Sequence, residues 1–357
     1  MKLGARILKT GIAITLALYI ASLLNLNPPA FAGVAALFAI QPSIYRSYQT
    51  ILEQIQANII GAVFAVVFVL MFGNGPFVVG LVAIITIGIM IKLKIEKTIP
   101  LAVVTVILIM GTPEESFIAF ASNRFLVIMV GVLCSFVVNL VFIPPKYETK
   151  LYNKIVSNMG YITQWIRLAT RNDAEHKVLK ENLNKLKEDM LKSDQYYLLY
   201  KEERDYLKKY DYTKGRKLVL FRQMHITNDK ALAILKNLDL HDVQLKEMPD
   251  LFQKEIQVHL DNLTSYHERI LLKYIGKVRN QSPEQLLSEI NEGEKSLTEA
   301  YVEFYNHKNV EQCKWMTIFP LIGLIIDYSD ELEHLDKLVD SFYSYHQDDN
   351  EVEINIE

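Results

Sequence analysis

The sequence predicts an all-α protein in which a six-span transmembrane helical block is followed by a cytoplasmic helical bundle. Residues 1–146 contain six apolar segments separated by short breaks that hold Pro, Gly or charged residues. Lys and Arg fall almost entirely in alternate breaks. From residue 147 onward the chain is charge-rich and repeats apolar residues at helical spacing, which is typical of helices that bury one face.

About 20 apolar residues in a helix cross the hydrocarbon core, and a helix satisfies its backbone polar groups internally. The second and fifth segments are short and bounded by Pro or Gly. The first could alternatively be a cleavable signal peptide, but the charge alternation favours a span. The predicted spans are 7–24, 29–42, 51–72, 76–91, 98–111 and 123–143.

The breaks predict which way the block is oriented. The first and third carry no charge, and the fifth carries Glu114 and Glu115. Cytoplasmic loops carry an excess of Lys and Arg, so we expect a multi-pass protein of the cell membrane with both termini cytoplasmic. Arg124 is the exception, at the outer mouth of the sixth segment. The other Lys and Arg residues of this block lie at its N-terminus and in the second, fourth and sixth breaks: Lys2, Arg6, Lys9, Arg46, Lys92, Lys94, Lys97 and Lys146.

The segment lengths read long, short, long in each half of the block. Three spans per half would make the second half run inverted relative to the first. In transporters built this way, interrupted segments at matching places point to a transport site near the repeat interface. The two halves share no obvious residue similarity, so six loosely packed helices of unequal length are the alternative.

Polar groups inside the spans are few, and they are candidates for function because hydrocarbon makes them costly. The substrate-path candidates are Arg46, Asn58, Arg124 and Asn139. Arg can bind a carboxylate through two parallel hydrogen bonds. Glu53, near Asn58, is the candidate for coupling to protons. The alternatives are interhelical hydrogen bonds for the two Asn, charge anchoring for Arg46 and an interfacial position for Glu53.

Residues 147–346 are predicted to form a cytoplasmic helical domain of five or six helices, and residues 347–357 an acidic disordered tail. Leu179, Leu183, Leu186 and Met190 mark one buried stripe. Breaks between helices are expected at 172–173, 212–215, 239–250, 280–283 and 307–309.

Composition excludes several functions. The first 146 residues hold 9 of the 38 Lys and Arg and 4 of the 41 Asp and Glu residues, so the rest carries a net charge of −8 (29 against 37). That charge argues against nucleic acid as a partner. The Gly-rich phosphate-binding motif of nucleotide-driven pumps is absent, and neither the eight His nor the two Cys residues group. The sequence therefore predicts no cofactor, no metal site and no enzyme.

The run QPSIYRSYQTILEQIQANIIGA, residues 41–62, resembles the fusaric-acid-resistance-like superfamily. In that superfamily an Arg after the second span leads into a Gly-containing third span, and Arg46 and Gly61 match this pattern. With its helical tail, the whole chain resembles the aromatic acid exporter family with a C-terminal cytoplasmic domain.

The resemblance implies an integral membrane exporter of small organic anions, with aromatic acids as the expected class. Larger relatives carry two membrane blocks, so a single block implies a homo-oligomer. Export without a nucleotide motif would draw on an ion gradient, and proton coupling is one option. The expected partners are the lipid bilayer, organic anions and further copies of the chain. The alternative is a non-transporting membrane anchor whose cytoplasmic helical domain recruits partners or senses a ligand.

Overall fold

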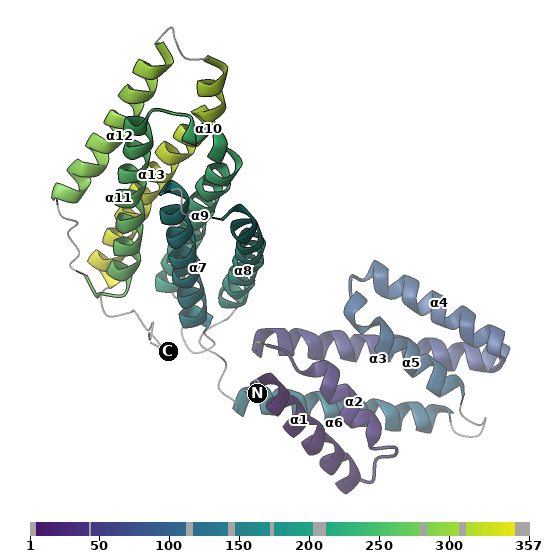
Figure 1. Cartoon of the computed structure of the whole chain (residues 1–357). Helices are drawn as coiled ribbons and strands as arrows, with labels where there is room; N and C mark the ends of the chain where they lie inside the picture. The colour runs from purple at the N-terminus through teal and green to yellow at the C-terminus, as the bar shows by residue number, and fades with distance from the viewer. Residues whose placement is uncertain are drawn as a thin grey trace. The chain divides into compact units, whose positions relative to one another are not determined.

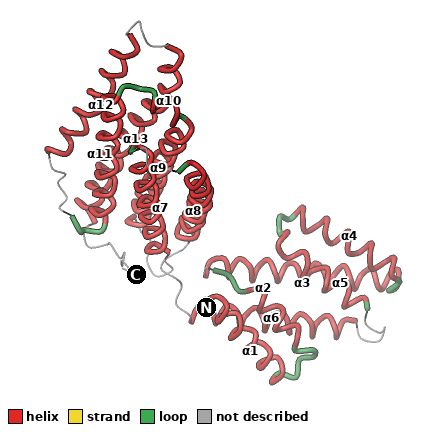
Figure 2. The backbone as a smooth tube through the Cα atoms, in the orientation of Figure 1, coloured by secondary structure: helices red, strands yellow, loops and turns green. Residues whose placement is uncertain are grey.

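The computed structural model describes residues 5–42, 44–111, 117–141, 147–171, 175–202, 212–278, 284–306 and 312–346. Every regular element in these ranges is helical, so the all-α prediction is confirmed for this part of the chain (Figure 2). The chain divides into two compact units, Met1–Pro145 and Lys146–Glu357.

The first unit contains six α-helices within its described ranges, but they differ in length. Helices α3 and α6 are long and apolar enough to cross a membrane: an 18-residue window within Arg46–Phe72 has a mean hydropathy of 2.4, and one within Ala119–Val141 has 2.3. The prediction of six full spans is therefore met only in part, because α1, α2 and α4 are shorter apolar helices. The elements are α1 (Ala5–Leu23), α2 (Ala30–Ala39), α3 (Ile44–Phe72), α4 (Pro76–Lys92), the 3-10 turn η1 (Glu96–Thr98), α5 (Ile99–Met110) and α6 (Phe117–Val141).

Helix α3 begins earlier than its apolar run. The prediction placed Arg46 in a break, whereas the structure places it in the first turn of α3. Ser47, Thr50 and Gln54 lie on one side of this polar first part of the helix and are buried. The helix therefore starts before the residue at which the apolar run begins. Helix α6 likewise starts before the predicted residue 123.

In the first unit, the third helix of each half packs on the first two helices of the other half. Helix α6 packs on α1 and α2, α3 packs on α4 and α5, and α3 also contacts α6 (Figure 1). Two glycines make the closest approaches. A Cβ on Gly61 of α3 would lie 2.8 Å from the Ala102 carbonyl oxygen of α5, and one on Gly131 of α6 would lie 2.2 Å from that of Ala32 in α2. Small residues permit such close backbone contact.

These two contacts are related by a constant shift along the chain. Gly131 stands 70 positions after Gly61, and Ala102 stands 70 positions after Ala32. The buried faces repeat with the same shift, which gives the predicted repeat support at residue level. The buried pairs are 54/124, 57/127, 58/128, 61/131 and 65/135 in α3 and α6, and 32/102, 35/105, 36/106, 39/109 and 40/110 in α2 and α5.

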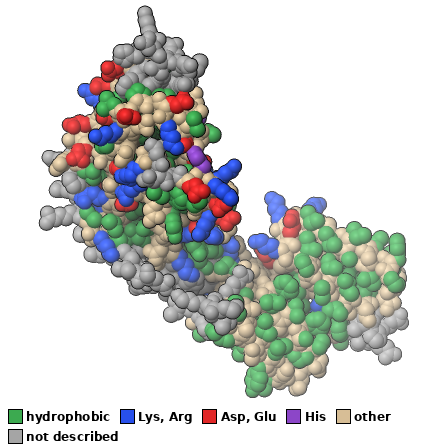
Figure 3. Space-filling view, in the orientation of Figure 1, with side chains coloured by type: hydrophobic (Ala, Val, Ile, Leu, Met, Phe, Trp, Pro, Cys, Tyr) green, Lys and Arg blue, Asp and Glu red, His purple; other side chains and the backbone are tan. Residues whose placement is uncertain are grey.

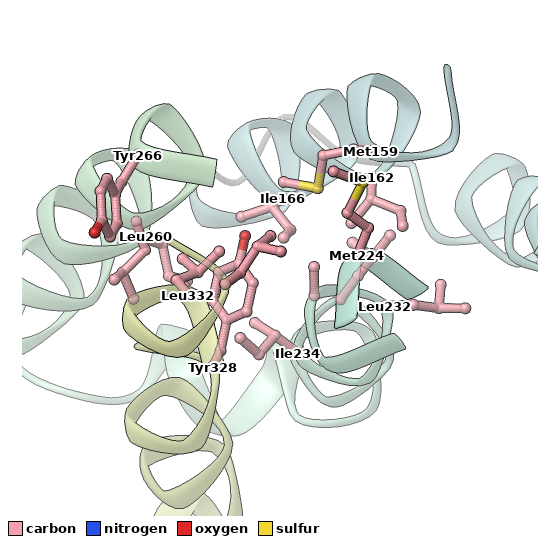
Figure 4. Close-up of a cluster of buried hydrophobic side chains, with 14 of the residues drawn as sticks. Met159, Ile162, Ile166, Met224, Leu232, Ile234, Leu260, Tyr266, Tyr328 and Leu332 are labelled. Atoms are coloured by element: carbon pink, nitrogen blue, oxygen red, sulfur yellow. The ribbon is translucent and has the colours of Figure 1, made fainter. Parts of the chain in front are cut away.

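The second unit is a helical bundle around one hydrophobic core. Side chains from α7, α9, α11 and α13 meet there, among them Ile162, Met224, Leu260 and Tyr328 (Figure 4). Its described part has six long helices and the short α10, where five or six helices were predicted. The helices are α7 (Tyr147–Thr170), α8 (His176–Glu202), α9 (Tyr212–Leu240), α10 (Asp242–Lys246), α11 (Asp250–Tyr274), α12 (Glu284–Asn306) and α13 (Gln312–His346).

The buried stripe and two of the five expected breaks can be compared with these helices. The stripe from Leu179 to Met190 is buried as predicted, and the break at 239–250 is confirmed by the end of α9, the short α10 and the start of α11. The break at 212–215 is wrong, because these residues form the first turn of α9. A single Gly near a helix end costs too little to stop the helix. The other three breaks and the tail 347–357 lie outside the described residues.

The surfaces of the two units differ in kind. Figure 3 shows mainly apolar side chains on the visible face of the first unit, with charged ones gathered at one end. Among its exposed side chains are Leu70, Phe72, Phe77 and Ile84. The visible face of the second unit mixes basic and acidic side chains. An apolar face of this extent on a helical unit is what contact with lipid requires.

Candidate functional site

Hydrogen bonds between helix ends define two ends of the first unit. At one, the Asn139 amide donates to Ser47 Oγ at 2.7 Å and to the Gln41 carbonyl at 3.2 Å, and Lys9 Nζ donates to Asn139 Oδ1 at 3.3 Å. We call this the basic end. At the other, the Asn27 end, the Asn123 amide donates to the Asn27 carbonyl at 2.5 Å.

The basic end contains a pocket between α2, α3, η1 and α5. It encloses about 590 Å³ of empty space, part of it open to solvent. Glu53 is half-buried on its wall, and Lys97 of η1 lines it while remaining exposed. Gln54 is buried, and no hydrogen-bond donor among the described residues reaches its Oε1. The pocket therefore offers a cation, a carboxylate and a carboxamide within an otherwise largely apolar unit.

Arg124 is the buried cation of the Asn27 end. Its side chain is on α6, is 3% exposed, and lies with Cζ 4.2 Å from the centre of the Phe31 ring of α2. Nε and Nη1 have no hydrogen-bond partner among the described residues. A buried charge without an opposite charge is costly, so this guanidinium is suited to an anion that enters from outside the chain.

The two candidate Asn side chains make interhelical hydrogen bonds, the alternative to direct substrate contact. Asn58 of α3 is buried; its amide donates to the Gln54 carbonyl at 2.8 Å, and Thr105 of α5 donates to its Oδ1 at 2.8 Å. Asn139 ties α6 to Ser47 of α3. Both amides thus link the third helix of one half to a helix of the other.

The structure groups some of the sequence candidates and separates others. Glu53 lies on the pocket wall, and Asn58 follows it by about one turn on α3. Arg46 is half-buried in the first turn of the same helix, next to Ser47, the partner of Asn139. Arg124 lies at the other end of the unit.

Sequence reasoning missed three residues that complete these groups. Thr105 lies within an apolar run, and Phe31 has the character of a lipid-facing residue. Lys97 was used only as one of the basic residues that predict the cytoplasmic side. The available signal was the shift of 70 positions, which pairs Leu101 with Phe31 and Gln54 with Arg124.

Together, the apolar helices, the polar groups between them and the two ends with ionisable side chains are features of helical membrane proteins. A family model described as "Aromatic acid exporter family member 1" matches residues 1–142. A second, described as "Aluminium activated malate transporter", matches residues 99–210.

The chain is 50% identical to the UPF0421 protein YgaE of Bacillus subtilis over 356 residues, which is 99% of each chain. UPF0421 proteins of Oceanobacillus iheyensis and Staphylococcus saprophyticus are 30% and 36% identical over 155 residues, 43% of this chain and 44% and 47% of theirs. The chain therefore belongs to the aromatic acid exporter family and shares its full length with a UPF0421 relative.

The resemblance that the sequence suggested is thus confirmed. Membership of this family indicates a membrane protein and points to organic-acid transport rather than to catalysis.

Proposed function

We propose that this chain exports small organic anions, aromatic carboxylates in particular, across the cell membrane. The observation that carries the proposal is the buried Arg124 guanidinium, with Nε and Nη1 unpartnered among the described residues and the Phe31 ring beside it. A guanidinium can hold a carboxylate through two parallel hydrogen bonds. The Phe31 ring adds an aromatic surface for the rest of the substrate.

The side of the membrane that the pocket faces is inferred from the positions of the basic residues. Lys9 and Lys97 belong to the basic end, and Arg46 precedes Ser47 there. An excess of such residues favours the cytoplasmic side, so the pocket faces the cytoplasm and both termini are cytoplasmic. Arg46 would then attract anions to the side from which they leave the cell.

Glu53 is the proposed coupling residue, because it is a carboxylate on the wall of the cytoplasmic pocket. Proton-driven transport needs a group that can gain and lose a proton inside the membrane unit. Glu53→Gln removes that proton exchange at nearly constant shape. The variant is expected to reach the membrane and lose export against a gradient. Continued uphill export by Glu53→Gln would mean that coupling lies elsewhere or that the path is passive.

The transport test uses inside-out vesicles from cells that express the full chain, with labelled benzoate as the probe. Arg124→Ala is expected to lower the initial rate at least about tenfold, the loss expected for one charge-assisted hydrogen bond. Arg46→Ala is also expected to impair uptake. Lys92→Ala, an exposed position on α4, is the control. If the unaltered chain moves neither benzoate nor a panel of other organic acids, the non-transporting anchor is favoured.

The proposal includes a homo-oligomer, because the chain carries one membrane block where larger relatives carry two. Mass photometry of the chain in lipid nanodiscs measures this directly. A particle mass of two or more chains supports the oligomer, and the mass of one chain that transports benzoate overturns it.

A further inference from the structure

Asn27, Phe31, Asn123 and Arg124 form the group that we call the Arg124 cluster. The pocket and this cluster are built from equivalent positions of the two halves. Adding 70 to the residue number converts Asn27 to Lys97 and Phe31 to Leu101, and it converts Gln54 to Arg124. Glu53 corresponds in the same way to Asn123. Lys97, Leu101, Glu53 and Gln54 all line the pocket at the basic end.

At the Asn27 end the equivalent residues contact one another. Asn123 donates a hydrogen bond to the Asn27 carbonyl, and the Arg124 guanidinium lies on the Phe31 ring. At the basic end, Glu53 and Lys97 instead border an open space of about 590 Å³. One end is therefore open where its counterpart is closed by side-chain contacts. Transporters with inverted repeats open their two ends in turn by moving one repeat against the other.

We propose that the pocket is a binding site for the substrate carboxylate, held by Lys97 and Gln54, and that it opens in alternation with the Arg124 cluster as the second end of one path. This inference rests on the proposed function and names the second half of its site. The ligand class is a monocarboxylate with an apolar body, because the pocket pairs one cation with the apolar side chains of Phe38 and Leu101.

The charged side chains of the pocket act differently when the basic end is open and when it is closed. In the open state, Lys97 attracts the substrate carboxylate, the Gln54 amide can donate a hydrogen bond to it, and the carboxyl group of Glu53 disfavours it. In the closed state, Glu53 and Lys97 take the places that Asn123 and Asn27 hold at the other end, and an ion pair replaces the amide–carbonyl bond. Lys97→Gln and Glu53→Gln should therefore change ligand binding in opposite directions.

The binding test measures protection of a cysteine placed in the pocket. Thr50 lines the pocket and is replaced by Cys in a full-length chain whose native Cys134 and Cys313 are changed to Ala and Ser. Inside-out vesicles are treated with a membrane-impermeant methanethiosulfonate at increasing benzoate concentrations. Benzoate is expected to slow the reaction.

Three matched variants test how the charges of Lys97 and Glu53 affect benzoate binding. Lys97→Gln is expected to raise the half-protecting benzoate concentration about tenfold, the effect of losing one charge-assisted hydrogen bond. Glu53→Gln is expected to lower it, and Lys92→Gln, outside the pocket, to leave it unchanged. Equal protection in the Lys97→Gln and Lys92→Gln chains would overturn the pocket as the carboxylate site.

The alternation test compares the two ends. Phe120 is the equivalent of Thr50, because it stands 70 positions later. Arg124→Ala loosens the Asn27 end, so a Cys at 120 should react several-fold faster from outside in right-side-out vesicles, while the Cys at 50 reacts several-fold slower from inside. Ser122→Ala, exposed on α6, is the control. If Arg124→Ala leaves the reaction rate of the cysteine at position 50 unchanged, alternation of the two ends is overturned.

These outcomes separate the inference from the proposed function. Benzoate transport by the unaltered chain, with protection that is the same in all three variants, refutes the pocket and leaves export intact. No transport of any organic acid refutes export, whatever the accessibility of positions 50 and 120.

Discussion

Lys273 of α11 is fully buried in the second unit, where its charge is neutralised by α13. Its Nζ lies 2.6 Å from Asp336 Oδ1 and 2.7 Å from Asp340 Oδ1, and the Tyr266 hydroxyl donates to Asp336 at 2.9 Å. Asp340 is half exposed, whereas Asp336 is buried. The pair between Lys273 and Asp336 is therefore the one that water cannot replace.

Replacing Lys273 should be costly for this reason. Lys273→Met removes the cation that neutralises the buried Asp336 and is expected to destabilise the second unit by about 3–5 kcal/mol. Asp340→Asn should cost about 1 kcal/mol or less, because that carboxylate is solvated. Both Trp residues, Trp165 and Trp315, belong to the second unit, so urea titration of the detergent-solubilised chain followed by Trp fluorescence measures it. Equal losses of unfolding free energy in Lys273→Met and Asp340→Asn would show that the buried ion pair matters no more than the solvated one.

Three buried histidines of the second unit titrate below their ordinary range. Burial lowers the pKa of His225, lowers that of His259 to about 4 and lowers that of His267 to about 3. His267 lies 2.9 Å from the Tyr328 hydroxyl and 3.2 Å from that of Thr227. The folded state thus requires a neutral imidazole, while the unfolded chain takes up a proton near the ordinary pKa of 6.5.

The sign of the pH dependence follows from this difference. Between pH 6.5 and the lowered pKa the unfolded state binds more protons, so stability falls as the pH falls through this window. For His267 alone the loss from pH 8 to pH 5 is about 2 kcal/mol. His267→Gln should reduce this slope even if it lowers stability at pH 8, and His334→Gln, exposed on α13, should not. Parallel slopes for the unaltered and His267→Gln chains, from urea titrations at both pH values, would contradict the assignment.

At the scale of elements, the glycine contacts fix the distance between paired helices in the first unit. A Cβ on Gly131 would lie 2.2 Å from the Ala32 oxygen and 2.9 Å from Ala35 Cβ, so α2 and α6 must separate to accept alanine. Forcing extra volume into a packed contact costs about 1–3 kcal/mol. Gly88 on α4 has no such neighbour within 4 Å. Gly88→Ala should be neutral or slightly stabilising, because Ala favours a helix.

Thiol exposure during heating measures this prediction. Cys134 is buried in α6 close to Gly131, and Cys313 is removed by replacement with Ser. A thiol-reactive dye should report a lower melting temperature for Gly131→Ala than for Gly88→Ala. Indistinguishable melting temperatures would show that α2 and α6 can separate at no cost.

The same helices show how far the sequence could predict the fold. Apolar runs located all six helices of the first unit, because their length and hydropathy are local properties. Helix α3 was predicted too short, since Ser47, Thr50 and Gln54 are buried only through packing against other helices. The repeat was expected from segment lengths alone, and its residue-level form emerged only once buried faces could be compared.

The site was predicted less completely than the fold. Arg124 and Glu53 stand out as ionisable residues in or beside apolar runs, so composition was enough to find them. The partners Phe31 and Thr105 are ordinary residues of apolar segments, and they gain a role only through α2–α6 and α3–α5 packing. Lys97 belongs to a connection whose approach to Glu53 depends on how η1 folds over α3.

At the scale of the whole chain, the orientation of the membrane unit decides whether the pocket loads or releases substrate. The α3–α4 connection contains the exposed Asn74, and the α4–α5 connection contains the exposed Lys94. Helix α4 separates the two, so they belong on opposite sides of the membrane if α4 crosses it. The charge rule puts Lys94 in the cytoplasm.

Single-cysteine labelling of intact cells tests this orientation. In a chain without Cys134 and Cys313, Asn74→Cys is expected to react with an impermeant maleimide from outside, and Lys94→Cys only after the membrane is opened. Lys94→Cys labelling in intact cells would put the pocket on the outer face, because Lys97 follows Lys94 in the same connection. Lys97 and Gln54 would then bind the anion at the outer end of the path, and Arg124, at the cytoplasmic end, would be the residue that loads it for export.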